Sequence, residues 1–276
     1  MDQKNDRLEK EGFHDRARRQ ELIAEYLLQH SSAQIQDLAE QFKVSTMTVH
    51  RDLDELERQG MLRKVRGGAT AQPSSLFESD IRFRLGSASQ EKVAIARCAL
   101  QYVEPGQAVM MDDSTTTLAL ARLLPEVIPL TVITNSLTIM VELTPVKGIS
   151  LISLGGEYVP RYGAFTGLIC EQAVSSLRAN ILFMSTSAIS DNVAFHQEQD
   201  IVKVKRLMMG SAALRILLVD SSKLHKTALH RLATIDQFDR VIVDARIDAD
   251  CLDELRKANI NVEVAELKSG LIPGDD

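Results

Sequence analysis

Apolar residues recur at helical spacing in three short segments near the start of the chain. These segments cover residues 22–27, 35–42 and 49–56, and the spacing is typical of helices with one buried face. Ser45 is a good N-cap for the third helix, and Gly60 stands where a glycine commonly ends a helix. Only a short turn separates the second and third segments, so the pattern predicts a helix-turn-helix.

The third predicted helix has polar side chains where a helix-turn-helix presents them to DNA. Hydroxyl and guanidinium groups bond phosphates and base edges, and a methionine side chain can touch a thymine methyl group. We expect such contacts from the N-terminal end and the outer face of this helix, which hold Ser45, Thr46, Met47, Thr48, His50 and Arg51. The alternative interpretation is a three-helix packing module with a solvated, charged outer face.

Residues 61–70 predict two short strands around a tight basic turn, which form a wing. The side chains of Arg63, Lys64 and Arg66 are placed to meet the phosphate backbone, and such contacts weaken steeply with salt. The total charge does not favour DNA binding, because the chain has a formal net charge of −6 and residues 16–70 hold nine basic against eight acidic side chains. The placement of the cations therefore indicates DNA binding better than their number does.

These segments resemble the DeoR family of bacterial transcriptional regulators. The motifs are RRQELIAEYL and VSTMTVHRDLDELERQGMLRKVRGGAT, and the resemblance continues across most of the chain. It implies a winged helix-turn-helix that binds double-stranded operator DNA. His50-Arg51 stands where the family usually has an arginine pair, and Arg66 stands where it usually has a histidine. These departures concern the operator sequence that is preferred.

Beyond residue 90 the pattern changes to short apolar strands that alternate with helices. Strands are predicted at residues 108–111, 130–134, 149–154, 181–185, 216–219 and 241–243, and helices at 91–102, 116–124, 136–143, 167–178 and 199–214. Near-continuous apolar strands separated by helices favour a parallel sheet that is covered on both faces. The predicted fold is thus an α/β sensor domain with a parallel-rich sheet, preceded by a small winged helix-turn-helix domain.

Composition and pattern together divide the chain into five parts. They are a disordered N-terminal tail at residues 1–15, the winged helix-turn-helix at 16–71, a linker at 72–90, the effector-binding α/β domain at 91–268 and a tail at 269–276. The linker contains a proline and several serines and has few periodic apolar positions.

Polar residues follow several of the predicted strands directly. They are Asp112, Asp113, Ser114, Thr115, Thr116 and Thr117 after the first strand, Asn135 after the second, Gly155 and Gly156 after the third, residues 185–187 at the end of the fourth and residues 220–223, which end in Lys223, after the fifth. Each group alone is commonly a helix cap or a turn. Ligands of open parallel sheets bind at the carboxyl ends of the strands, so the coincidence predicts one ligand site.

The family resemblance extends through this half and implies roles for these residues. The family motif Asp-Ser/Ala-Gly-Thr-Thr-Thr appears as residues 112–117, and Val204-Lys205-Arg206 also matches. The resemblance implies a fold similar to sugar-phosphate isomerases and a phosphorylated sugar or related metabolite as effector. It implies phosphate binding by Ser114 to Thr117, sugar contacts from Asp112, Asn135, Gly156 and Lys205, and an anion contact from Lys223.

Two departures from the family pattern bear on the effector. Ser114 stands where the family commonly has glycine, and residues 191–199 lack the usual glycine-threonine-proline pattern. A side chain at position 114 keeps the backbone farther from a phosphate. An effector without a phosphate group therefore stays an open alternative.

Cysteine and histidine positions predict neither a metal site nor a cofactor. The three cysteines are far apart and form no CxxC pair, which argues against a disulfide framework or a zinc site and favours a reducing cytoplasm. His196, His225 and His230 do not have the spacing of metal ligands. No apolar run has the length of about 18 residues that a membrane span needs, so no membrane partner is expected.

The expected function is that of a DNA-binding transcriptional regulator, a repressor of carbohydrate-metabolism genes whose operator binding is controlled by a sugar phosphate or related metabolite. We expect a homodimer or homotetramer, because two half-sites multiply the base contacts that one helix can make. The alternative is a sugar-phosphate isomerase-like enzyme with an accessory DNA-binding module, in which Asp112 or Asp113 acts as a base. Carboxylates in such a site more commonly bond sugar hydroxyls, so the protein is expected not to be an enzyme.

Overall fold

The structure is a computed structural model that describes residues 16–30, 32–58, 61–70 and 80–267. Contacts divide the chain after Arg84 into two compact units, which are treated separately below as the head and the sensor unit. The tails expected at residues 1–15 and 269–276 lie outside the described residues, as do Gly60 and residues 71–79 of the expected linker. Helix α6 (Ile81–Gly86) falls inside the range that the sequence predicts to be a linker.

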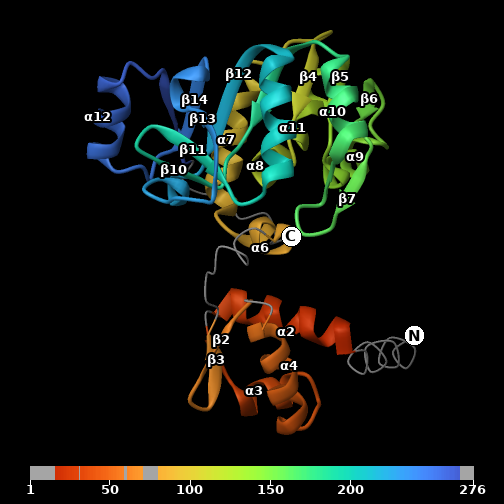
Figure 1. Cartoon of the computed structure of the whole chain (residues 1–276), viewed down its shortest axis with the longest axis vertical. Helices are drawn as coiled ribbons and strands as arrows, with labels where there is room; N and C mark the ends of the chain where they lie inside the picture. The colour runs from red at the N-terminus through yellow and green to blue at the C-terminus, as the bar shows by residue number, and fades with distance from the viewer. Residues whose placement is uncertain (1–15, 31, 59–60, 71–79, 268–276) are drawn as a thin grey trace, which may run out of the picture. The chain divides into compact units, whose positions relative to one another are not determined.

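The head is a winged helix-turn-helix (Figure 1). Its elements are α2 (Arg16–His30), β1 (Ser32–Gln34), α3 (Ile35–Gln41), α4 (Thr46–Arg58), β2 (Arg63–Val65) and β3 (Gly68–Thr70). One small core holds the predicted inward faces of the three helices, including Ile23, Leu38, Val49 and Leu53. The three helices and the β2–β3 wing confirm the predicted architecture.

Strand β1 was not predicted, and it completes a three-stranded sheet in the order β1-β3-β2. Ala33 of β1 lies opposite Ala69 of β3 in this antiparallel pairing. The backbones approach so closely that a Cβ atom at Gly68 would lie 2.3 Å from the carbonyl oxygen of Ala33. Gly68 therefore lets the wing pack against the start of the helix-turn-helix.

A buried ion pair joins the first and last helices of the head. Asp52 of α4 is 1% exposed, and its carboxylate accepts hydrogen bonds from Arg19 Nε at 2.6 Å and from Gln20 Nε2 at 3.1 Å. Because a buried carboxylate is costly unless it is paired, these donors hold α2 in register with α4.

The sensor unit is built around one seven-stranded sheet. Its helices and strands after α6 are α7 (Ser89–Leu100), β4 (Ala108–Met111), α8 (Thr115–Ala121), β5 (Leu130–Thr134), α9 (Leu137–Leu143), β6 (Ile149–Ser153), β7 (Glu157–Val159), β8 (Ala164–Thr166), α10 (Gly167–Ser175), β9 (Ala179–Met184), β10 (Ala188–Ser190), β11 (Val193–His196), α11 (Gln199–Gly210), β12 (Ala212–Val219), β13 (His230–Thr234), β14 (Arg240–Asp244), α12 (Ala249–Lys257) and β15 (Val262–Ala265). Short 3-10 helices are η1 (Leu124–Val127), η2 (Ser221–Lys223) and η3 (Ile235–Gln237).

The strand order in the large sheet is β15-β14-β12-β9-β4-β5-β6, and every strand pairing in it is parallel. The chain enters at β4 near the middle, builds β5 and β6 outward to one edge, and then returns to place β9 on the other side of β4. The order thus reverses between β4 and β9. In open α/β sheets a crevice for ligands forms outside the carboxyl ends of the strands at such a reversal.

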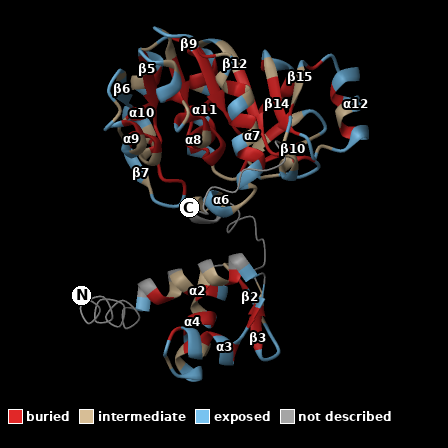
Figure 2. Ribbon diagram, turned by 180° about the vertical axis from the view of Figure 1, so that it is seen from behind, coloured by how far each residue is buried: buried red, intermediate tan, exposed pale blue. Residues whose placement is uncertain are grey.

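Both faces of the sheet are covered, which confirms the predicted α/β class. Along β4, Met110 packs into one core cluster, whereas Val109 and Met111 pack into the other. Helices α10, α11 and α12 contribute to the first cluster, and α7, α8 and α9 contribute to the second. The central strands are accordingly buried along most of their length (Figure 2).

Several predicted helices extend beyond their observed C-terminal ends, the helix at residues 199–214 by the most, and several short elements were missed. The helix expected at residues 199–214 ends at Gly210, and β12 begins at Ala212. Residues 212–214 pair with the start of β9, and this pairing outweighs the helical pattern of their side chains. The hairpin β7–β8, the small sheet β10-β11-β13, helix α12 and strand β15 were not predicted.

Within the described residues, no helix combines the length and the apolar character of a membrane span.

Replacing Asp52 with alanine should destabilise the head strongly, because the buried Arg19 guanidinium group would lose the Asp52 carboxylate. We expect a loss of about 3–5 kcal/mol in the free energy of unfolding, measured by urea unfolding of the full chain followed by circular dichroism. Asp54→Ala is the matched control, since Asp54 is exposed on the same helix and pairs with Lys64. It should cost less than about 1 kcal/mol, and equal losses in the two variants would contradict the role assigned to Asp52.

Candidate functional site

The first candidate site is the exposed surface of α4. Thr46, Met47 and Arg51 are exposed there, whereas Thr48 and His50 are half-buried. Ser45 Oγ accepts a hydrogen bond from the Thr48 backbone N–H at 3.1 Å, as expected of an N-cap. The Ser45 and Thr48 hydroxyl groups also bond each other at 2.9 Å. These two residues therefore shape the start of the helix, and the outward side chains at 46, 47 and 51 are open to a partner.

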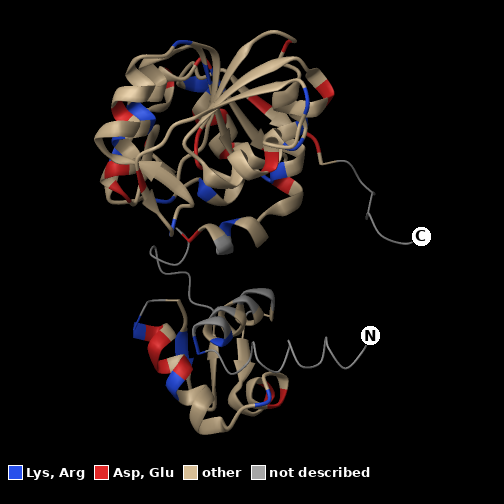
Figure 3. Cartoon of the chain, turned by 90° about the vertical axis from the view of Figure 1, so that its right-hand side faces the viewer, with Lys and Arg blue, Asp and Glu red and all other residues tan. Residues whose placement is uncertain are grey.

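The cationic side chains of the wing differ in whether they have an ion-pair partner. Arg63 and Arg66 are exposed, and within the described residues neither guanidinium group has a hydrogen-bond or ion-pair partner. Lys64 instead forms an ion pair with Asp54 of α4, and this hydrogen bond lowers the pKa of the Asp54 carboxyl. Acidic and basic positions are interspersed over the head (Figure 3). Arg63 and Arg66 are therefore better placed than Lys64 to meet phosphate.

The second candidate site lies where the strand order of the sensor unit reverses. Asp112 follows β4 and is 1% exposed. Its Oδ2 atom accepts a hydrogen bond from the Ser185 backbone N–H at the end of β9, at 2.8 Å, and another from Lys205 of α11. Its Oδ1 atom accepts from the Ser114 backbone N–H at 3.0 Å and from the Thr117 hydroxyl at 3.0 Å. One carboxylate thus joins two strand ends and two helices, α8 and α11.

Lys205 is the buried cation of this cluster. Its ammonium group also donates to the Ser185 carbonyl oxygen at 3.1 Å and lies 3.4 Å from Oδ1 of Asp113. Asp113 is as buried as Asp112. By formal charge, two carboxylates face one ammonium group in this cluster, which gives a formal net charge of one negative charge for the three side chains. A group that donates hydrogen bonds would be favoured next to it, and an anion would not.

The hydroxyl groups that follow β4 are partly used within the protein. Ser114 Oγ caps α8 by accepting from the Thr117 backbone N–H at 3.1 Å, and the Thr117 hydroxyl bonds Asp112. Of the residues that were expected to bind phosphate, Ser114 and Thr117 therefore organise the loop itself. Thr115 and Thr116 are buried beside them.

Asn135 follows β5, the neighbour of β4, and offers an acceptor to the same region. Its Nδ2 atom donates to the Phe165 carbonyl oxygen at 3.1 Å, which fixes the orientation of the amide. Its Oδ1 atom is buried and has no hydrogen-bond partner within the described residues. Since buried polar atoms are rarely left unpaired, this oxygen is a candidate acceptor for a ligand hydroxyl group.

Gly155 and Gly156 follow β6, the next strand along. Gly156 has φ +135°, and a Cβ atom there would lie 2.3 Å from the Thr166 carbonyl oxygen. Nothing lies within 4 Å of a Cβ atom built at Gly155. Gly156 is therefore required by the close packing of the loop against the end of β8, whereas Gly155 is not.

Lys223 lies in η2 after β12, on the other side of β9 from β4. Strand β9 therefore separates the end of β12, which precedes Lys223, from the end of β4. Within the described residues its ammonium group has no hydrogen-bond or ion-pair partner. Lys223 thus lies at the same edge of the sheet as the Asp112 cluster without touching it.

Comparison with known proteins assigns both units to one family. The DeoR-like helix-turn-helix domain matches residues 19–75, and the DeoR C terminal sensor domain matches residues 87–245. The chain belongs to the DeoR family. The resemblance deduced from the sequence is confirmed, and the protein is a DNA-binding transcriptional regulator.

Curated relatives of this DeoR-family regulator include both repressors and activators. An aga operon transcriptional repressor of Escherichia coli O157:H7 is 32% identical over 248 residues, covering 88% of this chain and 92% of the relative. The L-fucose operon activator of Escherichia coli K12 is 34% identical over 234 residues, covering 84% of this chain and 96% of the relative.

Solved structures give a weaker comparison for the DeoR-family chain. Ribose 5-phosphate isomerase A from Methanocaldococcus jannaschii is 16% identical and covers 50% of this chain and 55% of its own, with a TM-score of 0.37. This likeness is too low to bear on the function of the sensor unit.

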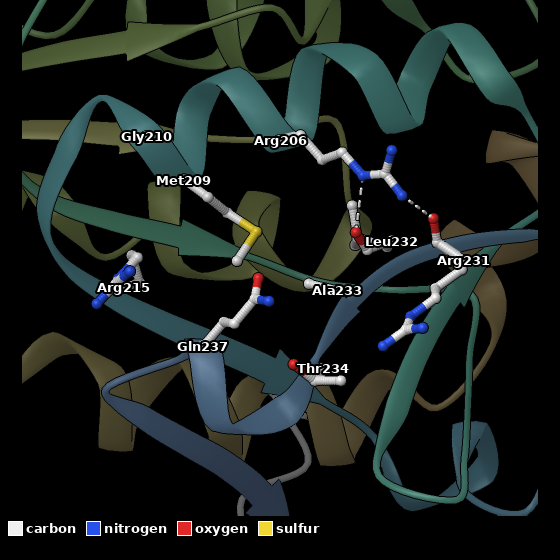
Figure 4. A pocket seen from close by; sticks show the side chains of 9 residues that line it. All are labelled: Arg206, Met209, Gly210, Arg215, Arg231, Leu232, Ala233, Thr234 and Gln237. Carbon is white, nitrogen blue, oxygen red and sulfur yellow. Dashed lines mark hydrogen bonds between the residues drawn. The ribbon is translucent and has the colours of Figure 1, made fainter.

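In this DeoR-family regulator the motif Val204-Lys205-Arg206 serves two separate regions. Lys205 belongs to the buried cluster, whereas Arg206 faces a pocket of about 550 Å³ on another side of α11 (Figure 4). Arg206 donates to the carbonyl oxygens of Leu232 at 2.9 Å and Arg231 at 2.6 Å. It thereby holds β13 against α11, and none of the expected effector residues lines this pocket.

Sequence reasoning missed two contributors to these sites. Ser185 was noted only as part of a polar strand end, yet both its backbone N–H and its carbonyl oxygen bond the Asp112–Lys205 pair. Asp54 was counted as one acid among eight, yet it neutralises Lys64 of the wing. Ser185 and Asp112 are far apart in the chain, and Asp54 and Lys64 lie in different elements, so no local pattern indicates either contact.

Exchanging Gly156 for alanine should destabilise the sensor unit, because the new Cβ atom would clash with the Thr166 backbone and φ +135° disfavours a side chain. We expect a loss of about 1–3 kcal/mol in the free energy of unfolding. Gly155→Ala is the matched control, since it meets open space, and it should change stability by less than about 0.5 kcal/mol. Thermal unfolding of the two variants tests this; a Gly156→Ala protein as stable as the control would show that the loop relaxes freely.

Proposed function

We propose that this regulator is a cytoplasmic repressor of carbohydrate-metabolism genes, and that a sugar phosphate or related metabolite controls its affinity for operator DNA. The observation that carries the proposal is the Asp112–Lys205 cluster at the reversal of strand order. The head of the same chain presents arginines that have no ion-pair partner within the described residues. Relatives named for the aga and L-fucose operons support control of sugar genes. One of them is named a repressor and the other an activator; repression is proposed here because it is the usual mode of the family that the sequence resembles.

The proposed DNA-binding surface combines the exposed end of α4 with the wing. Thr46, Met47 and Arg51 are proposed to reach base edges and phosphates in the major groove. Arg63 and Arg66 are proposed to meet the backbone beside it. Ser45 and Thr48 support the helix end, His50 lies half-buried beside it, and Lys64 contributes less because Asp54 already pairs with it.

The proposed effector site runs along the carboxyl ends of β6, β5, β4, β9 and β12. Asp113 and the unpaired Oδ1 atom of Asn135 are suited to accept hydrogen bonds from the hydroxyl groups of a sugar or polyol. A phosphate group on that ligand would avoid the negative cluster. We therefore assign it to the side of Thr115 and Thr116 or to the ammonium group of Lys223.

The sensor unit is proposed to bind this metabolite without turning it over. An isomerase would need a base within hydrogen-bond reach of a carbon acid. Lys205 lies against both Asp112 and Asp113, and Asp112 accepts three further hydrogen bonds. These contacts suit Asp112 to hold the site together rather than to move a proton.

Control of DNA binding requires the effector to bind two conformations of the regulator with different affinity. We propose that the working unit is a homodimer or homotetramer, so that two heads engage two half-sites about one turn of DNA apart. An effector that makes the spacing of the two heads less fixed then lowers operator affinity. The contacts that one head makes with DNA stay unchanged.

Arg51→Ala should weaken binding to DNA from the region upstream of the protein's own gene by about 1–3 kcal/mol, because a guanidinium contact to a base edge would be lost. Band-shift titration at constant salt measures the change. Arg58→Ala is the control, since Arg58 lies at the far end of the same helix and pairs with Glu55. Unchanged affinity in Arg51→Ala would remove this residue from the DNA-binding surface.

Lys223→Ala should reduce the response to a phosphorylated ligand and leave DNA binding without ligand intact. The experiment screens pairs of phosphorylated and free sugars by thermal shift, since a ligand of the folded state raises the melting temperature. We expect the phosphorylated member of a pair to lose most of its shift in Lys223→Ala, whereas the free sugar is unaffected. Loss of ligand-free DNA binding in this variant would instead indicate a structural role for Lys223.

A further inference from the structure

Three side chains of different metal-binding types meet at the start of α12. They are His225, Asp248 and Cys251, and their ligand atoms all lie within 4.8 Å of one another. His225 belongs to the segment after η2, whereas Asp248 and Cys251 belong to the N-cap and first turn of α12. No sequence pattern indicates this cluster, because its members do not have the spacing of a metal-binding motif.

The carboxylate of Asp248 is already oriented within this cluster. Its Oδ1 atom accepts a hydrogen bond from the Cys251 backbone N–H at 2.7 Å, and its Oδ2 atom lies 3.3 Å from Nε2 of His225. Zinc binds nitrogen, oxygen and sulfur at about 2.0–2.3 Å, so the ligand atoms of a tetrahedral site lie on the order of 3.5 Å apart. The three atoms therefore need to close by only roughly 1 Å to share one ion.

The chemistry of the three ligands selects the type of ion. A thiolate, an imidazole and a carboxylate together suit zinc and similar divalent transition metals, whereas magnesium and calcium prefer oxygen alone. A cysteine binds a metal ion as the thiolate, so the S–H group of the Cys251 thiol has to give up its proton. Metal binding breaks that S–H bond, forms a sulfur–metal bond and releases one proton to solvent.

The surroundings allow an ion to enter. The cluster borders a pocket of about 370 Å³, whose lining includes His225, Cys251, Asp191 and Glu254. The two carboxylates add negative charge near the cluster, and Lys257 in the same lining opposes it. The imidazole and the Asp248 carboxylate are exposed, so a fourth position on the ion stays open to water or to a further ligand.

We propose that His225, Asp248 and Cys251 form a site for a divalent transition-metal ion of the zinc type, with three protein ligands and one open position. The bound ion joins the segment that follows η2 to the first turn of α12. None of the three ligands is among the residues assigned to DNA or to the metabolite, although His225 lies two residues after Lys223, so metal binding can be tested without a metabolite or DNA.

Cobalt titration tests the site, because a thiolate bound to Co²⁺ gives a charge-transfer band in the near ultraviolet. Cobalt chloride is added to the untagged full-length protein, freed of metals and kept reduced. We expect a band that saturates at one ion per chain and is displaced by Zn²⁺. Cys251→Ser should abolish the band, and His225→Asn should weaken binding by at least about tenfold. His225 is exposed with φ +56°, a conformation that asparagine tolerates, so the second variant keeps the fold.

Cys98→Ser and His230→Asn are the matched controls, because they remove a thiol and an imidazole that lie outside the cluster. Both control variants should keep the band and the affinity. The proposal is overturned if the unmodified protein gives no band, if the band survives in Cys251→Ser, or if Cys98→Ser removes it.

Discussion

The ammonium group of Lys205 is the constraint around which the sensor unit is arranged. A cation buried at 2% exposure destabilises the fold by several kcal/mol unless carboxylates compensate it. Asp112 and Asp113 compensate it from the end of β4. The Ser185 carbonyl oxygen at the end of β9 accepts a hydrogen bond from the same ammonium group. The strand order reverses between these two strands. The interaction that joins the ends of β4 and β9 therefore also shapes the polar region that is proposed as the effector site.

The head also contains a buried ion pair, which there affects the surface expected to meet DNA. Asp52 is turned inward and neutralised by Arg19, so it does not repel DNA although it lies on the helix expected to read it. The pairing of Lys64 with Asp54 removes one cation from the wing. The exposed surface of the head then consists of a short polar helix end and three arginines, Arg51, Arg63 and Arg66. These arginines have no ion-pair partners in the described head. A head with little net charge can thus present a locally positive surface.

The fold was largely predictable from the sequence, and the candidate sites only in part. Apolar strands followed directly by polar residues located Asp112 and Asn135 at the carboxyl edge, since that pattern is local. The contact of Asp112 with Ser185 joins residues that are distant in the chain, and Lys205 was known only through the family resemblance. Short strands such as β10, β11 and β13 have no long apolar run to reveal them. The His225 cluster was missed for the same reason as Asp52–Arg19: tertiary packing brings these residues together.

The burial of the strand-end cluster has a consequence for how quickly a metabolite can be sensed. Asp113, Thr116 and Asn135 are each at most 2% exposed, so the metabolite contacts proposed for them require the side chains around them to move first. Binding that has to follow such a movement has an association rate that levels off as the metabolite concentration rises.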